Sequence, residues 1–69
     1  MDNARELIAI ALGIAEDAQD SSKELLAIHL RERGESTVRN KRKADFLREN
    51  ISATRDAQHL FKKFLHETS

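Results

Sequence analysis

A chain of 69 residues forms one domain at most, and it buries too small a fraction of its surface to be stable without support. The absence of Cys excludes disulfides and thiolate metal sites, and three scattered His residues are a poor ligand set, so no cofactor and no metal are expected. Self-association is the remaining way to enlarge the core, which predicts a homodimer. The chain also lacks Pro, and its 39% hydrophobic residues are mostly Leu, Ile and Ala, a composition that favours an all-α fold.

Charge is unevenly distributed along the chain, although the 12 basic and 12 acidic residues cancel overall. Residues 1–30 carry two basic and six acidic residues, a net charge of −4. Residues 31–43 carry six basic and two acidic residues, a net charge of +4, and residues 44–69 are balanced. The middle of the chain is therefore a cationic segment.

The apolar run at residues 7–15 does not have the features of an export signal or of a membrane span. It follows Asp2 and Glu6 instead of a positively charged segment, and it is too short to cross a bilayer. The sequence predicts a cytoplasmic protein without membrane association.

The first predicted helix covers about residues 3–33. Asn3 is a candidate N-cap with Glu6 as its capping-box partner, and Gly34 is a candidate left-handed residue after the last turn. Spacings of four and three residues define the stripe that is expected to face the second helix. This stripe comprises Leu7, Ala11, Ile14, Ala18, Ser21, Leu25 and Ile28.

A break in this helix is an alternative. Ser21 and Glu24 form a second capping box directly before Leu25 and Leu26, so a helix could start anew near residues 20–22. No Gly or Pro interrupts this stretch, and the four-three spacing continues through it. The pattern favours one continuous helix.

The second predicted helix covers about residues 37–67, after a turn at residues 34–36, and Ser36 or Thr37 is its candidate cap. Its apolar stripe comprises Ala44, Leu47, Ile51, Thr54, Phe61 and Leu65, supplemented by Ala57 and Phe64. Because the turn lies near the midpoint of the chain, the two helices have nearly equal lengths of about 50 Å. Residues 1–69 are therefore expected to form a single antiparallel helical hairpin.

The N-terminal half of the first helix is apolar on more sides than one partner helix can cover. The predicted fold is therefore an all-α, two-helix antiparallel hairpin that dimerises into a four-helix bundle. The predicted dimer interface comprises Leu7, Ile8, Ile10, Ala11, Ile14, Leu60, Phe61, Phe64 and Leu65. The alternative is that part of this patch receives an apolar helix of a target protein.

The cationic segment is the candidate partner-binding site. It comprises Arg31, Arg33, Arg39, Asn40, Lys41, Arg42 and Lys43. At the turn these residues would form a tip that docks on an acidic protein surface or on the phosphate backbone of nucleic acid. Nucleic acid is the less favoured partner because no aromatic residue in the segment can stack on bases. A solvated turn with no partner is a further alternative.

Four acidic residues form a band on the first helix, at Glu16, Asp17, Asp20 and Glu24. We expect this band to face solvent and to pair with Arg48 or Arg55. The alternative is a decoy for a DNA-binding surface, in which the band covers the cationic recognition helix of a transcription factor.

Other functional patterns are weaker. Residues 34–40 are similar to the turn and start of a recognition helix, but a helix-turn-helix motif needs a third helix and a shorter recognition helix. His29, His59 and His66 have neither a Cys partner nor paired carboxylates across a cleft. The sequence therefore predicts no catalytic site and no metal site.

The equal-armed hairpin with its turn at Gly34 resembles the plasmid copy-number regulator Rop, a dimeric four-helix bundle that binds paired RNA loops. In size and layout, as a Cys-free helical chain of 69 residues, it also resembles the small phage-encoded quorum-sensing anti-activators of Pseudomonas, which silence a LuxR-type transcriptional activator. The second resemblance implies a homodimeric protein–protein interaction module that inhibits a regulatory protein in transcription regulation. The first implies nucleic-acid binding by the basic turn region. Neither resemblance carries over a functional residue.

Overall fold

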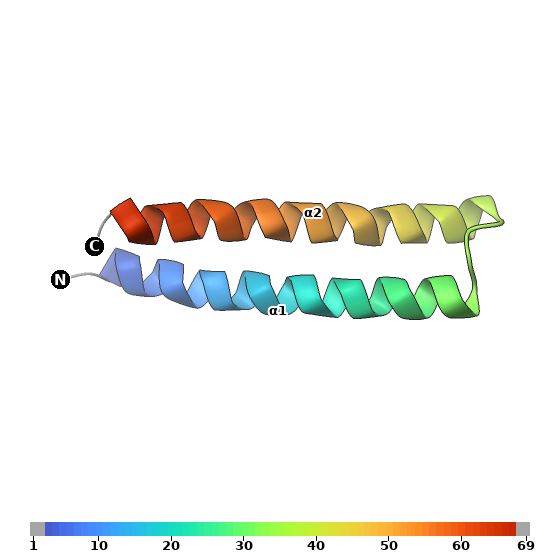
Figure 1. Ribbon diagram of the computed structural model, residues 1–69, viewed down its shortest axis with the longest axis horizontal. Helices are drawn as coiled ribbons and strands as arrows, with labels where there is room; N and C mark the ends of the chain where they lie inside the picture. The colour runs from blue at the N-terminus through green and yellow to red at the C-terminus, as the bar shows by residue number, and fades with distance from the viewer. Residues whose placement is uncertain (1–2, 68–69) are drawn as a thin grey trace.

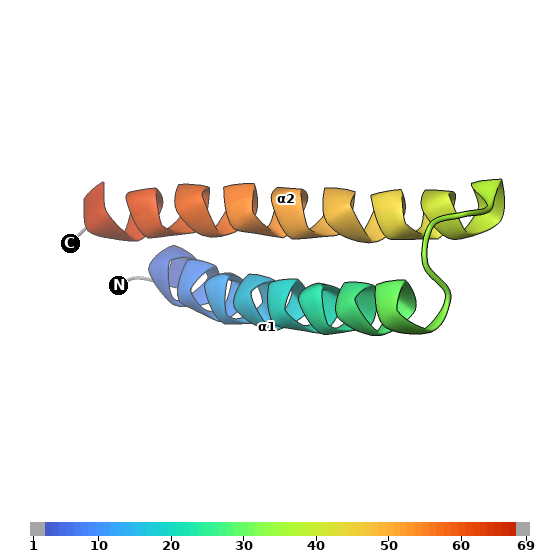
Figure 2. The ribbon, with the colours of Figure 1, turned by 45° about the vertical axis from the view of Figure 1, so that its right-hand side comes forward.

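Two long helices joined by a short turn form the fold, which is taken from a computed structural model that describes residues 3–67 (Figure 1). α1 comprises Asn3–Glu32 and α2 comprises Val38–Glu67. They run antiparallel and lie side by side in a rod about 52 Å long (Figures 1 and 2). The described residues contain no strand and no third helix, which confirms the all-α hairpin and excludes a helix-turn-helix motif within them.

α1 is continuous through residues 20–22, so the alternative of a break there is wrong. The helix continues because no Gly or Pro interrupts it and because its spacing of buried residues continues unshifted. The predicted bounds differ from the observed bounds by one residue at each side of the turn, where helix ends fray.

The turn closes the hairpin at Gly34, whose φ of 72° is the left-handed conformation that favours glycine. The His29 carbonyl accepts hydrogen bonds from the backbone N–H of Arg33 at 2.8 Å and of Gly34 at 3.0 Å. At the start of α2, the Asn40 N–H donates to Thr37 Oγ1 at 3.1 Å. Thr37 is therefore the cap of α2.

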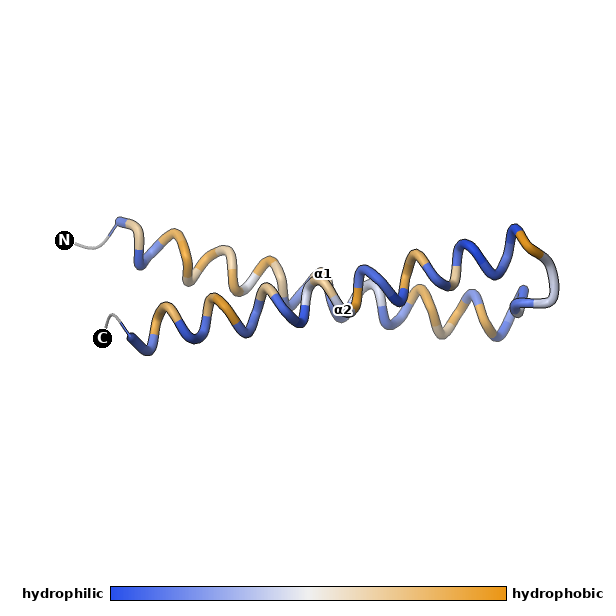
Figure 3. Tube along the Cα trace, turned by 90° about the horizontal axis from the view of Figure 1, so that it is seen from above, coloured by the Kyte–Doolittle hydropathy of each residue, from blue (hydrophilic) through white to orange (hydrophobic). Residues whose placement is uncertain are grey.

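One stripe of each helix faces the other helix, and we call these the inner stripes. The inner stripe of α1 comprises Ile8, Leu12, Ala15, Gln19, Ser22, Leu26 and His29, and that of α2 comprises Asn40, Ala44, Leu47, Ile51, Thr54, Gln58, Phe61 and Leu65. Both have alternating spacings of three and four residues, which is the pattern of helices that cross at a shallow angle (Figure 3). The stripe predicted for the second helix lies within the inner stripe of α2 or beside it.

The stripe predicted for the first helix is wrong by one residue. Leu7, Ile14 and Leu25 are 65%, 64% and 55% exposed, whereas the residue after each of them is buried or half-buried. The prediction selected the more apolar of two neighbouring stripes, and the structure turns the less apolar one toward α2.

Polar side chains in the inner stripes bond across the hairpin. Gln58 Nε2 donates to Gln19 Oε1 at 2.7 Å, and His29 Nε2 lies 2.8 Å from the Asn40 carbonyl oxygen. No buried side-chain nitrogen or oxygen in the described residues lacks a partner. The buried hydrophobic residues among them are Ala15, Ala44 and Leu47. A single hairpin therefore has a very small apolar core.

Candidate functional site

An apolar stripe runs along the outside of α1, one residue before each position of the inner stripe. It comprises Leu7, Ala11, Ile14, Ala18, Ser21, Leu25 and Ile28. Ile10 lies beside it and is 57% exposed. A step of one residue turns a helix by about 100°, so this outer stripe of α1 faces one side of the hairpin instead of α2.

α2 carries an outer stripe at the corresponding offset, also one residue before its inner stripe. It comprises Arg39, Lys43, Phe46, Asn50, Ala53, Ala57, Leu60 and Phe64, and Glu67 continues its spacing of three and four residues at the C-terminal end. Phe46 and Leu60 are 62% and 67% exposed. Exposed apolar side chains that share one side of a protein form a candidate interaction surface.

Both outer stripes lie on the same side of the hairpin. Two antiparallel helices are related by a twofold axis perpendicular to the plane that contains them. A rotation about this axis exchanges the two helices and does not exchange the two sides of the plane. Because each outer stripe precedes its inner stripe by one residue, both outer stripes lie on the same side of that plane. The two stripes together form a continuous side of the hairpin, which we call the outer face.

The residues predicted as the dimer interface divide between the outer face and the interior. The exposed members are Leu7, Ile10, Ile14, Leu60 and Phe64. The half-buried members are Ala11, at the edge of the outer face, and Ile8, Phe61 and Leu65, which lie between α1 and α2. Leu25 and Phe46 are also exposed on the outer face and were not among the predicted residues. Phe46 lies seven residues before Ala53 and fourteen before Leu60, a spacing that could have placed it on this stripe.

The cationic residues lie together at the turn end of the hairpin, where α2 is strongly hydrophilic (Figure 3). Arg31, Arg33, Arg39, Lys41, Arg42 and Lys43 are exposed and Asn40 is half-buried. A cavity of about 360 Å³ is lined by Arg33, Arg39, Asn40 and Lys43, with no carboxylate among them. Lys41 Nζ lies 3.7 Å from Asp45 Oδ2, and the other five cations form no ion pair within residues 3–67.

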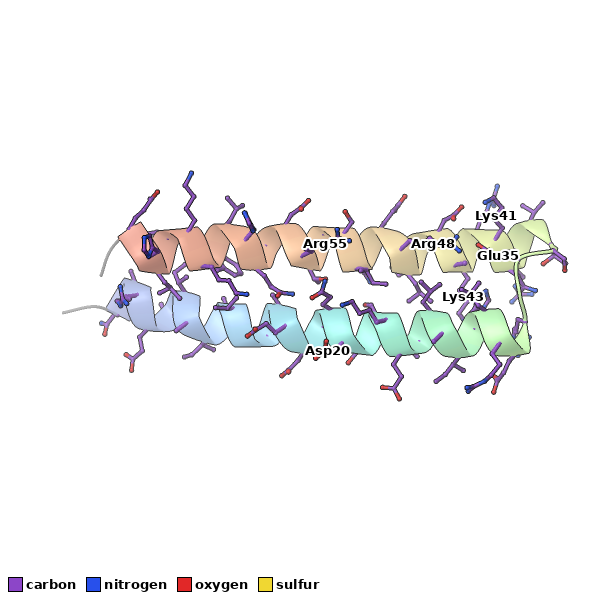
Figure 4. All side chains as sticks on the ribbon, viewed as in Figure 1. Asp20, Glu35, Lys41, Lys43, Arg48 and Arg55 are labelled. Carbon is purple, nitrogen blue, oxygen red and sulfur yellow. The ribbon has the colours of Figure 1, made fainter. Side chains whose placement is uncertain are left out.

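Arg48 binds the carboxylates beside this cationic tip. Its Nη1 donates to Glu35 and, at 3.0 Å, to Asp45 Oδ1 (Figure 4). The hydrogen bond from Arg48 holds the pKa of the Glu35 carboxyl below its usual value. The predicted pairing of Arg48 with the acidic band of α1 is therefore wrong. Arg55 and Asp20, near the middle of their helices, form no ion pair within the described residues either (Figure 4).

The described histidines do not assemble a metal site. His59 and His66 are exposed on α2, whereas His29 is buried at 5% exposure and bonded to α2 as described above. Residues 3–67 contain no cluster of three or more His, Cys, Asp or Glu side chains that could hold a metal ion. Neither helix, over the same residues, has an apolar stretch long enough to cross a bilayer.

Comparison with protein-family models, with curated proteins and with solved structures found no match to this chain. The functional interpretation therefore rests on two features of the chain itself, the outer face and the cationic tip.

Proposed function

We propose that the chain is a non-enzymatic binding protein that forms a homodimer of helical hairpins, a four-helix bundle, and inhibits a regulatory protein. A transcriptional activator of the LuxR type is the class of target that the layout favours, and the cytoplasm is the compartment in which such a target acts. The outer face is the observation that carries the proposal, because an exposed apolar side of this kind favours a second copy.

The outer face supports self-association because of its size and because the core beneath it is small. The hairpin measures 52 by 14 by 13 Å along its principal axes, so one of its long sides spans about 52 by 14 Å. That area of about 700 Å² approaches the ~800 Å² that each partner buries in a stable interface, before side chains widen it. A second copy supplies the same apolar surface in return, so both copies gain a core that neither has alone.

The cationic tip supports a contact with a second, acidic protein. Arg33 and Arg39 have no ion pair within residues 3–67, and the N-terminal end of α2 adds positive potential beside them. An acidic surface complements such a tip and is steered toward it. A regulatory protein whose working surface is covered in this way can no longer bind its own target.

Sedimentation at micromolar concentration tests the dimer, and we expect twice the chain mass. Ile14→Asp places a charge on the outer face and is expected to give a helical monomer, because a dimer would bury the charge without a partner. Ser52→Asp is the matched control, since Ser52 is exposed and lies on neither stripe of α2. A monomeric mass for the unsubstituted helical chain would contradict the proposal.

Affinity purification from the native host tests the partner. We expect one protein at near-equal stoichiometry that survives nuclease, is lost with Arg33→Gln/Arg39→Gln and is retained with Lys62→Gln/Lys63→Gln. Both double variants remove two positive charges, but only the first removes them from the cavity at the tip. Loss of all bound material on nuclease treatment would replace the inhibitor with the nucleic-acid-binding alternative.

A further inference from the structure

We propose that two copies pack outer face to outer face with their turns at opposite ends of the bundle. In this arrangement α1 lies along the partner's α1, and α2 lies along the partner's α2. The inference rests on the dimer of the proposed function and adds its geometry. Three independent features support it. Each outer stripe is nearly symmetric about a central point, the two centres lie at nearly the same height along the hairpin, and the charges favour separated turns.

The outer stripe of α2 is nearly symmetric about residue 55. Phe46 and Phe64 lie nine residues on either side of this point, and Ala53 and Ala57 lie two residues on either side. When two copies of one helix pack antiparallel about a twofold axis, each residue faces the residue at the same distance beyond the axis. Phe46 then faces the partner's Phe64, and the small alanines let the helices approach closely at the axis.

The outer stripe of α1 is also nearly symmetric, about a point between residues 17 and 18. Leu7 then faces the partner's Ile28, and Ile14 faces the partner's Ser21. Ala11 faces a point within one residue of the partner's Leu25. Large side chains thus meet small ones on two levels, as interdigitated layers require, and Ala18 lies beside the axis.

The two centres lie at nearly the same level of the hairpin, which one twofold axis requires. Gln58 Nε2 reaches both the Ala15 carbonyl oxygen, at 3.5 Å, and the Gln19 side chain. Toward the turn, His29 bonds to the Asn40 carbonyl oxygen. These contacts place residue 55 of α2 within about one helical turn of residue 18 of α1. A single axis can therefore relate both helix pairs.

The charge distribution favours this arrangement over the one in which both turns lie at the same end. That alternative also covers the apolar side chains, but it brings together two segments 31–43 that each carry a net charge of +4. With the turns at opposite ends, the cationic tips are separated by roughly the 52 Å length of the hairpin. Lys43 then faces the partner's Glu67, because both lie twelve residues from the centre at 55. Turns at opposite ends therefore bring opposite charges together, whereas turns at the same end bring like charges together.

Spin-label distance measurements test the arrangement, and the absence of Cys makes single labels straightforward. A label at Ser36→Cys, exposed in the turn, reports the separation of the two turns. The expected distance is on the order of the 52 Å length, against a distance on the order of the 14 Å width for turns at one end. The control label at Asp17→Cys lies exposed at mid-length and gives a short distance in either arrangement.

The outcomes distinguish the arrangement from the dimer. A long distance at Ser36→Cys with a short distance at Asp17→Cys supports the inference. Short distances at both positions would overturn the arrangement and leave the dimer intact. The absence of dipolar coupling at both positions, in samples that retain their helicity, would remove the dimer and the arrangement with it.

Discussion

Lys43 and Glu67 are the two residues that test the charge pattern of the outer face. They are 24 residues apart on α2, about 36 Å along the helix, so they cannot touch within one copy. Lys43→Glu and Glu67→Lys are each expected to weaken the dimer about 2- to 5-fold, because each places like charges opposite each other. The double variant is expected to restore the original dissociation constant, measured by sedimentation equilibrium at low salt.

Lys62→Glu is the control for this charge swap, since Lys62 is exposed on α2 but lies outside its outer stripe. It changes the same charge and is expected to leave the dissociation constant nearly unchanged. If the two swaps only added their effects, then residues 43 and 67 would not face each other, and the turns would not lie at opposite ends.

The inner stripe of α1 shows how single polar residues decide which side of a helix is buried. Gln19, Ser22 and His29 make this stripe less apolar than its neighbour, yet it faces α2. Gln58 and the Asn40 carbonyl on α2 supply hydrogen-bond partners for Gln19 and His29. Burial of these side chains is acceptable only because those partners are in place.

At the level of whole elements, the two glycines have opposite roles. Gly34 adopts a left-handed conformation in the turn, and Gly34→Ala is expected to destabilise the protein by about 1–2 kcal/mol. Gly13 lies inside α1, where an added Cβ meets no atom within 4 Å, so Gly13→Ala is expected to stabilise by about 1 kcal/mol. Urea unfolding of both variants at one protein concentration measures the two effects. If both variants changed the free energy of unfolding in the same direction, the two glycines would not have opposite roles.

α1 as an element has two adjacent stripes of mostly apolar residues, and only one of them faces α2. Hydrophobic periodicity alone favours the stripe that contains Leu7, Ile14 and Leu25 as the contact with α2, because that stripe is the more apolar. The structure gives that contact to the next stripe and leaves the more apolar one on the outer face. A helix with two apolar stripes is suited to a bundle, in which it touches two neighbours.

On the scale of the whole molecule, the small core and the exposed outer face have one cause. Two helices form a single layer, and each can cover only one stripe of the other. The buried apolar residues among those described are two alanines and Leu47, whereas Phe46, Leu60 and Leu7 are each more than half exposed. Nine large apolar side chains of the described residues are exposed, and the second copy that we propose would cover those on the outer face.

The sequence by itself determined the helical class, the bounds of both helices within one residue, and the left-handed turn at Gly34. These features depend on neighbours in the chain, namely spacing, capping and backbone conformation, so a local pattern is sufficient to predict them. Only the tertiary structure decided which stripe of α1 faces α2, that Arg48 binds Glu35 instead of the acidic band, and that Arg33, Arg39 and Lys43 line one cavity. Those features depend on atoms that the turn brings together from distant parts of the chain, and the spacing along one helix contains no information about them.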